Sequence, residues 1–230
     1  MDVRLHCAEA GAGETLILLH GNGEDSTYFA RQIPFLAGHF RVLAVDSRGH
    51  GRSPRGGGAL SIEGFADDLA DFMDERGIAR AYLLGFSDGA NVAMAFALRR
   101  PERVRKLILD GGNLNPWGMK PGVLLPVWLE WLALGIPAIF SRRARRKWEL
   151  LNLMATQPRL KRADLAALTM PALVIAGTDD MIRSRHTEAI ARALPHGRLC
   201  VLPGSHFVAR ENPEAFNAAA LKFLTEESCE

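Results

Sequence analysis

The sequence predicts a three-layer α/β fold, in which a mostly parallel, twisted sheet carries helices on both faces and receives one helical insert. Short apolar runs alternate with longer amphipathic stretches along most of the 230 residues. The runs are continuously apolar, as expected for parallel strands that are buried on both faces. This alternation breaks once, between residues 112 and 169, and the break marks the insert.

Six apolar runs are the expected strands, and their alternation with helices favours right-handed crossovers. In chain order they are Leu16–His20, Arg41–Asp46, Ala81–Phe86, Lys106–Asp110, Ala172–Gly177 and Arg198–Leu202. We expect a further antiparallel edge strand over Val3–Cys7.

Four helices are expected between and after these strands. Ile62–Arg76 places its large apolar residues at helical spacing, with Ser61 as the N-cap. The other three are Asn91–Arg99, Thr187–Leu194 and Pro213–Thr225, the last with proline in its first turn.

The insert differs in composition from the rest of the chain. Residues 112–169 hold all four tryptophans and a net charge of +6, which leaves about −4 for the remainder. We therefore expect a core formed by residues 1–111 and 170–230, and an insert of residues 112–169. The apolar stretch 121–140 is long enough to span a bilayer, but three prolines, two glycines and Glu130 interrupt it. A broken apolar helix that covers a pocket is favoured over a membrane segment.

Composition excludes several classes of protein. The net charge of +2 gives no reason to expect nucleic acid, and no apolar leader is visible near Met1. Cys7, Cys200 and Cys229 are far apart and form no CxxC pair, which indicates a reducing, cytoplasmic location without a metal site. The basic cluster at 142–147 is interpreted as a solvated helix face, although it could also steer anions or contact acidic surfaces. The apolar insert also allows a homodimer.

The strongest chemical signal is the segment Gly85-Phe86-Ser87-Asp88-Gly89, which follows one expected strand and precedes a helix. In this context GxSxG predicts a sharp turn that presents the Ser87 hydroxyl at the carboxyl edge of the sheet. The glycines allow close backbone approach, and the N–H groups of the next helix can stabilise an oxyanion. A glycine-rich turn with an incidental serine is the alternative.

Over nearly its whole length the chain resembles the α/β-hydrolase superfamily. The resemblance rests on this elbow and, in the family's order, on LILLHGNG at 16–23, DSRGHGRS at 46–53, PALVIAGTDD at 171–180 and GSHF at 204–207. It implies a serine nucleophile, Ser87, and a base, His206, in the loop after the last strand. The family's Gly-x-x-Asp pattern, read from Gly177, favours Asp180 over Asp179 as the acid.

The resemblance also implies an oxyanion hole formed by the backbone N–H groups of Asn22 and Asp88. The insert lies where the family has its lid, and Trp117, Trp128 and Trp131 are the expected substrate-binding residues of an apolar roof. His20 and the segment 46–53 are interpreted as structural.

Together these features predict a serine hydrolase that cleaves a small carboxylic ester through an acyl-enzyme, without metal or organic cofactor. A lactone, a thioester or a C–C bond next to a carbonyl could be cleaved by the same triad, with perhydrolysis as a side reaction. A non-enzymatic binding protein on this fold is the alternative from another class. The carboxylate of Asp88 could favour an amino-bearing substrate, although stabilisation of the helix terminus explains it as well.

Overall fold

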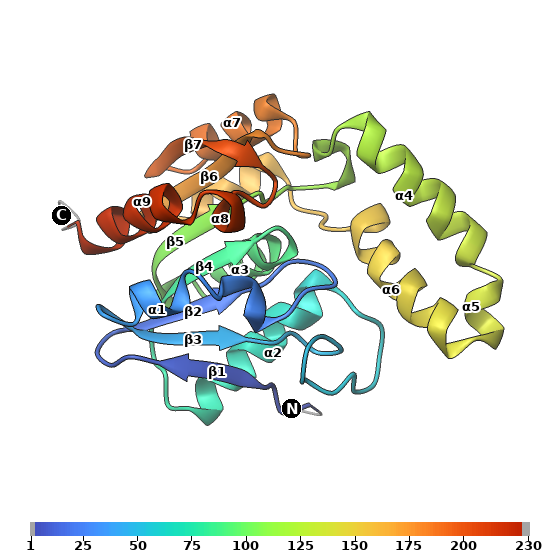
Figure 1. Ribbon diagram of the computed structural model, residues 1–230, viewed down its shortest axis with the longest axis horizontal. Coiled ribbons are helices and arrows are strands. Elements are labelled where there is room, and N and C mark those ends of the chain that lie inside the picture. The colour runs from blue at the N-terminus through green and yellow to red at the C-terminus, as the bar shows by residue number, and fades with distance from the viewer. Residues whose placement is uncertain (1–2, 227–230) are drawn as a thin grey trace.

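The computed structural model describes residues 3–226, and its centre is a seven-stranded sheet with the order β1-β3-β2-β4-β5-β6-β7 (Figure 1). All neighbouring strands are parallel except β1 and β3. The strands are β1 (Cys7–Ala10), β2 (Thr15–Leu19), β3 (Arg41–Val45), β4 (Ala81–Phe86), β5 (Val104–Asp110), β6 (Ala172–Asp179) and β7 (Gly197–Ser205).

The six strands predicted from apolar runs are thus confirmed, except that β7 is an edge strand with half-buried and exposed residues and not a central one. The antiparallel edge strand exists but begins later than expected. Cys7 pairs with Val45, and the pairing continues to Ala10. The preceding Val3 and Leu5 are buried in the core, so their apolar character serves packing and not strand pairing. Cys7 and Cys200 are free thiols, whereas Cys229 lies outside the described residues.

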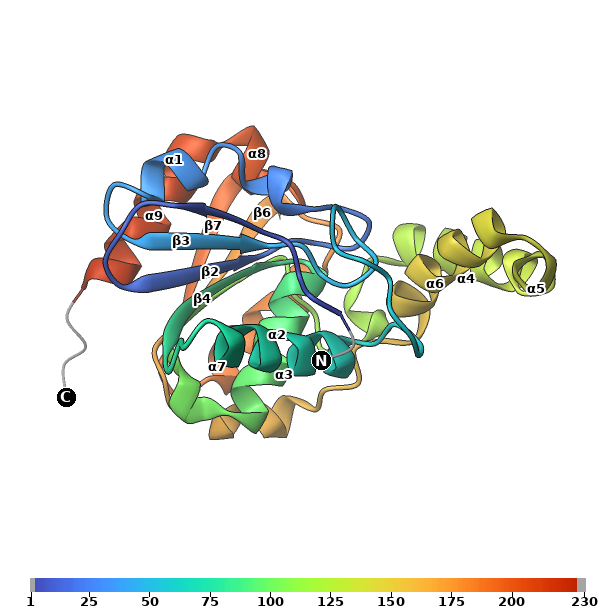
Figure 2. The ribbon, with the colours of Figure 1, turned by 90° about the horizontal axis from the view of Figure 1, so that it is seen from below.

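Helices cover both faces of the sheet (Figure 2). One face carries α2 (Ile62–Glu75), α3 (Asp88–Arg99) and α7 (Ser184–Ala193), and the other carries α1 (Ile33–Leu36), α8 (Val208–Glu211) and α9 (Pro213–Thr225). Short 3₁₀ turns lie at Ser26–Phe29, Pro101–Arg103, Pro116–Gly118 and Arg162–Ala167. The predicted N-cap of α2 is confirmed, since Ser61 Oγ accepts the Gly64 N–H at 3.0 Å.

Two apolar cores lie on opposite sides of the sheet because successive strand residues point to opposite faces. On β2, Ile17 and Leu19 belong to the core that α2 and α3 cover, whereas Leu16 and Leu18 belong to the core under α9. Full burial of each such side chain contributes about 2 kcal/mol to stability. Strands β2 to β6 are therefore largely buried on both faces, which explains their continuous apolar runs, whereas β7 at the edge is partly exposed.

Between β5 and β6 the chain forms a helical arm that extends away from the sheet (Figure 2). It contains α4 (Pro121–Leu134), α5 (Pro137–Phe140) and α6 (Arg142–Thr156). The predicted break in the apolar stretch is confirmed, because α4 ends before Gly135. Among residues 3–226, no helix combines the length and apolar character that crossing a bilayer requires.

The arm is fastened to the core where it begins and where it ends. Leu160 N–H donates to the Leu114 carbonyl at 2.9 Å, which ties the outgoing chain to the incoming chain. Lys120 N–H donates to the Met181 carbonyl, and Arg183 N–H donates to the Gly118 carbonyl. These bonds hold the base of the arm beside the carboxyl end of β6.

Candidate active site

Ser87 lies in the turn between β4 and α3 and has a left-handed backbone, with φ +52°. It is the one non-glycine residue with positive φ in the part of the chain that the structure describes. Such a conformation costs about 1–3 kcal/mol and is held by its surroundings. A Cβ on Gly85 would lie 2.3 Å from the Gly89 oxygen, and a Cβ on Gly89 would lie 2.0 Å from the Leu19 oxygen. Both glycines are therefore required by close backbone approach.

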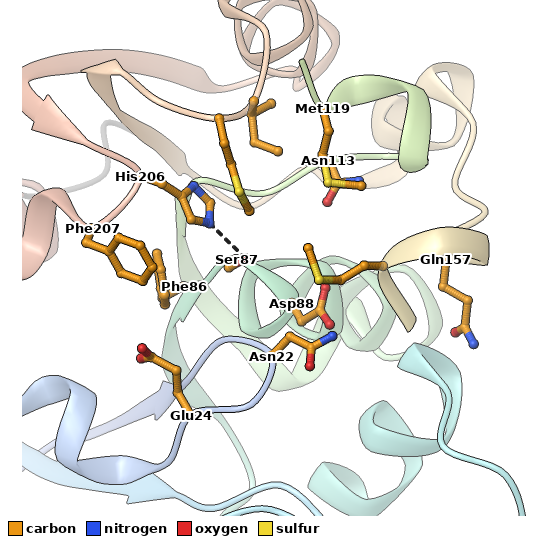
Figure 3. A pocket seen from close by; sticks show the side chains of 13 residues that line it. Asn22, Glu24, Phe86, Ser87, Asp88, Asn113, Met119, Gln157, His206 and Phe207 are labelled. Atoms are coloured by element: carbon orange, nitrogen blue, oxygen red, sulfur yellow. Dashed lines mark hydrogen bonds between the residues drawn. The ribbon is translucent and has the colours of Figure 1, made fainter. Parts of the chain in front are cut away.

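The three residues of the expected triad come together at the carboxyl edge of the sheet, and Figure 3 shows Ser87 and His206 of this group. His206 Nε2 lies 3.0 Å from Ser87 Oγ, and His206 Nδ1 lies 2.7 Å from Asp180 Oδ1. The Ile182 N–H also donates to Asp180 Oδ1 at 2.8 Å. Because the carboxylate accepts the Nδ1 proton, Nε2 is free to accept the serine proton. Asp179, the alternative acid, is exposed at the end of β6.

The His206 side chain is buried in a close-fitting site. The rings of Phe86 and Phe207 lie with centroids 5.0 Å and 5.6 Å from the imidazole. Gly111 follows β5 directly and has a φ of +61°. Its Cα lies against the His206 ring. A side chain there would meet the imidazole, so this glycine leaves the space that the ring fills.

The expected oxyanion donors lie beside the serine. Asn22 and Asp88 line the same cavity as Ser87, and the N–H of Asp88 is in the first turn of α3, where helical N–H groups lack intrahelical acceptors. The loop of Asn22 comes so close that a Cβ on Gly21 would lie 2.9 Å from the Phe86 ring. The Asn22 side chain donates to the Leu150 carbonyl at 2.8 Å, which fastens this loop to α6.

Asp88 presents its carboxylate to the cavity. Oδ1 accepts the Asn91 amide at 3.3 Å, whereas the buried Oδ2 accepts no hydrogen bond of good geometry among the described residues. Burial raises the pKa of Asp88 to about 6, and the amides of Asn91 and Asn22 oppose part of the rise. The group therefore changes charge near neutral pH, one residue from the serine.

A second buried carboxyl group, which the sequence reasoning missed, lies behind the triad. Asp110 ends β5, and its backbone carbonyl accepts the Ser87 N–H at 2.7 Å. Neither carboxyl oxygen has a hydrogen-bond partner among residues 3–226. Burial raises the pKa of Asp110 well above its ordinary value, and the charge of nearby Asp180 adds to the rise. An acid at the carboxyl end of a parallel strand is a signal that could have identified it.

The cavity above Ser87 has a volume of about 200 Å³ and a mainly apolar lining. This is below the range of about 300–1,000 Å³ that drug-sized ligands occupy, so it suits a small substrate. Its lining contains two carboxylates, from Glu24 and Asp88, but no lysine or arginine. The remaining lining residues are Asn22, Phe86, Ser87, Asn113, Met119, Met154, Gln157, Met181, Ile182, His206 and Phe207.

The three tryptophans expected to bind substrate are not among these residues, and this corrects the sequence interpretation. Trp128 Nε1 donates to the Ala155 carbonyl, and Trp131 Nε1 donates to Asn152 Oδ1, so both pack α4 against α6. Trp117 is 63% exposed and contacts Trp128 edge to face. The residues of the arm that do line the cavity are Met119, Met154 and Gln157. No motif or spacing in the sequence marks these three residues.

The structural interpretation of His20 and of segment 46–53 is confirmed. His20 Nε2 accepts the Ser47 N–H at 2.9 Å, and its Nδ1 donates to the Gly21 carbonyl. Burial lowers the pKa of His20 to about 4. Asp46 accepts the N–H groups of Ser26 and Arg52, at 2.7 Å and 2.9 Å. These groups hold loops together and do not face the serine.

Comparison with known proteins decides the family. The family described as having the alpha/beta hydrolase fold matches residues 14–149, more than half of the chain. The chain belongs to the α/β-hydrolase family. This α/β hydrolase is 30% identical to a protein of Caulobacter sp. (strain K31) named as carbamate hydrolase RutD, over 97% of this chain and 95% of the relative.

Solved structures agree with this assignment. An enol-lactonase from Burkholderia xenovorans LB400 superposes with a TM-score of 0.83 at 26% identity, covering 97% of both chains. A thermophilic esterase from Thermogutta terrifontis superposes with a TM-score of 0.80 at 26% identity, covering 96% of this chain and 93% of that one. The chain is accordingly a hydrolase of this fold, and its relatives act on different bonds.

Proposed function

We propose that the protein is a serine hydrolase that cleaves small carboxylic esters through an acyl-enzyme intermediate. The observation that carries the proposal is the hydrogen-bonded chain from Ser87 through His206 to Asp180, at the floor of a small cavity. An unassisted serine hydroxyl is a poor nucleophile, and a histidine held by a carboxylate is the arrangement that activates it.

The reaction follows from this geometry. Ser87 Oγ attacks the ester carbonyl carbon while His206 Nε2 takes the hydroxyl proton, and Asp180 stabilises the imidazolium. The backbone N–H groups of Asn22 and Asp88 stabilise the negative oxygen, each at about 3 kcal/mol. His206 returns the proton to the leaving alcohol, and water then attacks the acyl-enzyme with the same residue as base.

The charge of the cavity favours esters over the substrates that some relatives act on. One relative is named 2-hydroxy-6-oxononadienedioate/2-hydroxy-6-oxononatrienedioate hydrolase, a name that denotes a substrate with two carboxylates. Here the lining has two carboxylates and no cationic lysine or arginine to pair with such a substrate. We therefore rank a neutral ester first and a neutral lactone second.

A second candidate is an ester with an amino group on its acyl part. It is supported by Asp88, which lines the cavity beside Ser87 and whose buried Oδ2 accepts no hydrogen bond of good geometry among the described residues, although the Asn22 amide lies near the carboxylate. An ammonium group would supply the missing partner. Helix stabilisation explains the residue type, but it does not use this second oxygen.

A fluorophosphonate probe tests the main proposal, because it labels only an activated serine. We expect the wild type and a Ser184→Ala control, which changes an exposed serine of α7, to be labelled equally. Ser87→Ala should abolish labelling and lower turnover of p-nitrophenyl acetate by at least about 10³-fold. An unlabelled wild type, or labelling that survives in Ser87→Ala, would contradict the proposal. A series of p-nitrophenyl esters, lactones and amino-acid esters would then rank the bonds.

A further inference from the structure

The arm carries a group of large apolar side chains that the rest of the described chain leaves exposed. On α4 its three members, Leu125, Leu129 and Leu132, follow one another at spacings of four and three residues, which places them on one side of the helix. At the outer end of the arm, α5 adds to the group, and Phe140 is 84% exposed. The outer apolar surface consists of Leu125, Leu129, Leu132, Ile136, Ile139 and Phe140.

The opposite side of α4 already has its partner. Val127 packs with Leu151 and Ala155 of α6, and the indoles of Trp128 and Trp131 bond to α6 as described above. A surface helix normally turns a polar face to water once its apolar stripe is packed. The helix α4 instead has a second apolar side, with Glu130 as its only charged residue, paired with Lys147. Packing within the arm therefore does not account for the apolar residues on the outer side of α4.

A concentration of positive charge adjoins this surface. The first turns of α6 hold five exposed basic residues, and only the N-cap Ser141 separates them from Phe140. They are Arg142, Arg143, Arg145, Arg146 and Lys147. Arginines in the first turns of a helix are disfavoured by its positive N-terminal dipole, so this placement costs stability in the isolated chain. A cleft of about 800 Å³ lies between these arginines and the loop of Arg55. Its one acid, Glu149, is paired with Arg55.

We propose that the outer end of the arm docks onto an anionic lipid surface. The side chains of the outer apolar surface would enter the boundary of the acyl chains, while the arginines of α6 would meet the headgroup phosphates. Apolar area combined with basic residues at one interface is the pattern of amphipathic membrane binding. With 14 residues, α4 is too short to span a bilayer, so the contact would be made at the surface, through the outer end of the arm.

The positive charge of the arm favours an anionic lipid surface over a second copy of the chain as the partner. Residues 112–169 carry a net +6, so a dimer through this surface would bring two strongly positive segments together. An anionic surface instead neutralises them. The shape of the molecule also permits the contact, because α5 is the part of the arm farthest from the sheet (Figure 2). A flat surface can reach it without meeting the core.

Co-sedimentation with vesicles tests the docking. We expect the wild type to bind vesicles of phosphatidylcholine that contain one third phosphatidylglycerol, and to bind pure phosphatidylcholine much less. Binding should weaken as salt rises, because exposed charges are screened within about 10 Å at 0.1 M salt. Soluble inorganic phosphate at equal ionic strength should weaken binding no more than chloride does.

Two pairs of substitutions separate the two components of the contact. Arg142→Gln with Arg143→Gln should weaken binding about 30-fold, since each basic residue near an anionic membrane contributes about fivefold. Ile139→Ser with Phe140→Ser should weaken it by at least about tenfold. All four positions are exposed, so the variants should keep the wild-type melting temperature and esterase activity.

Matched controls lie elsewhere on the surface. Arg31→Gln with Arg185→Gln makes the same change in charge, and Leu199→Ser with Val201→Ser removes two exposed apolar side chains of β7. Both should bind vesicles like the wild type. Absence of binding to anionic vesicles at low salt would overturn the proposal, as would equal losses in the controls. A lipid-free dimer that Ile139→Ser with Phe140→Ser disperses, seen by analytical ultracentrifugation, would assign the surface to a second copy instead.

Discussion

Gly111 offers a direct test of whether the position of His206 matters for catalysis. Its φ of +61° is strained for any other residue, and an added Cβ would lie 2.7 Å from His206 Cε1 and 2.9 Å from Nδ1. An ordinary contact is at least 3.4 Å, so in Gly111→Ala the ring must move by about 0.7 Å. A displacement near 1 Å costs on the order of 100-fold in rate, because reacting groups leave their aligned geometry. We therefore expect kcat for p-nitrophenyl acetate to fall about 100-fold.

Gly77 provides the matched control. It has nearly the same backbone, with φ +64°, but nothing within 4 Å of an added Cβ. Both alanine variants should lose about 1–2 kcal/mol in the free energy of unfolding from backbone strain, measured by urea titration. Only Gly111→Ala should lose activity. If a folded Gly111→Ala turned over substrate within about twofold of Gly77→Ala, the reasoning that links the imidazole position to the rate would be refuted.

Three further predictions concern the carboxylates and the C-terminal helix. Asp180→Asn should lower kcat about 10⁴-fold, whereas Asp110→Asn, which makes no bond to His206, should stay within about tenfold; the reverse order in steady-state kinetics would assign the acid to Asp110. The kcat/KM ratio of an amino-acid ester to a neutral ester should rise with pH through about 6, because Asp88 is neutral below its pKa and charged above it. The ratio cancels the titration of the base, so Asp88→Asn should make it flat, and a flat wild-type profile would remove the amino-ester preference. Lys106→Met removes three hydrogen bonds to carbonyls at the end of α9 and should lower the free energy of unfolding by about 1–3 kcal/mol in urea titration, with kcat unchanged. Unchanged stability would show that these bonds contribute nothing net.

The centre of the sheet could be predicted because strands β2 to β6 are largely buried on both faces, which leaves a continuous apolar signal. Ala81–Phe86 was predicted to the residue for this reason. The edge strand could not be placed as well, since Val3 and Leu5 are apolar to fill the core without pairing. An apolar residue alone does not tell whether its backbone is hydrogen-bonded.

The active site also has a part that the sequence predicts and a part that it does not. Positions next to strand ends, such as Ser87, Asp180 and His206, could be predicted because the fold brings all these ends to one edge. The cavity lining from the arm could not be predicted, because it depends on how α4 and α6 pack. Tryptophan suggested a substrate roof by its size, yet the indole N–H of Trp128 donates to a backbone carbonyl of α6, and the ring packs against cavity-lining residues without itself lining the cavity. Met154 occupies the cavity instead.

The backbone bond between Leu114 and Leu160 closes the arm into a loop whose two ends meet at the core. Such a closed excursion can be shortened, lengthened or exchanged at its tip while the strands that carry the serine, the acid and the histidine keep their register. Protein engineering can therefore change the outer part of the arm separately from the core that carries the triad. Exchanging only the tip between α4 and α6 would change the outer surface of the arm while keeping the three cavity-lining residues of the arm and the bond from Asn22 to Leu150.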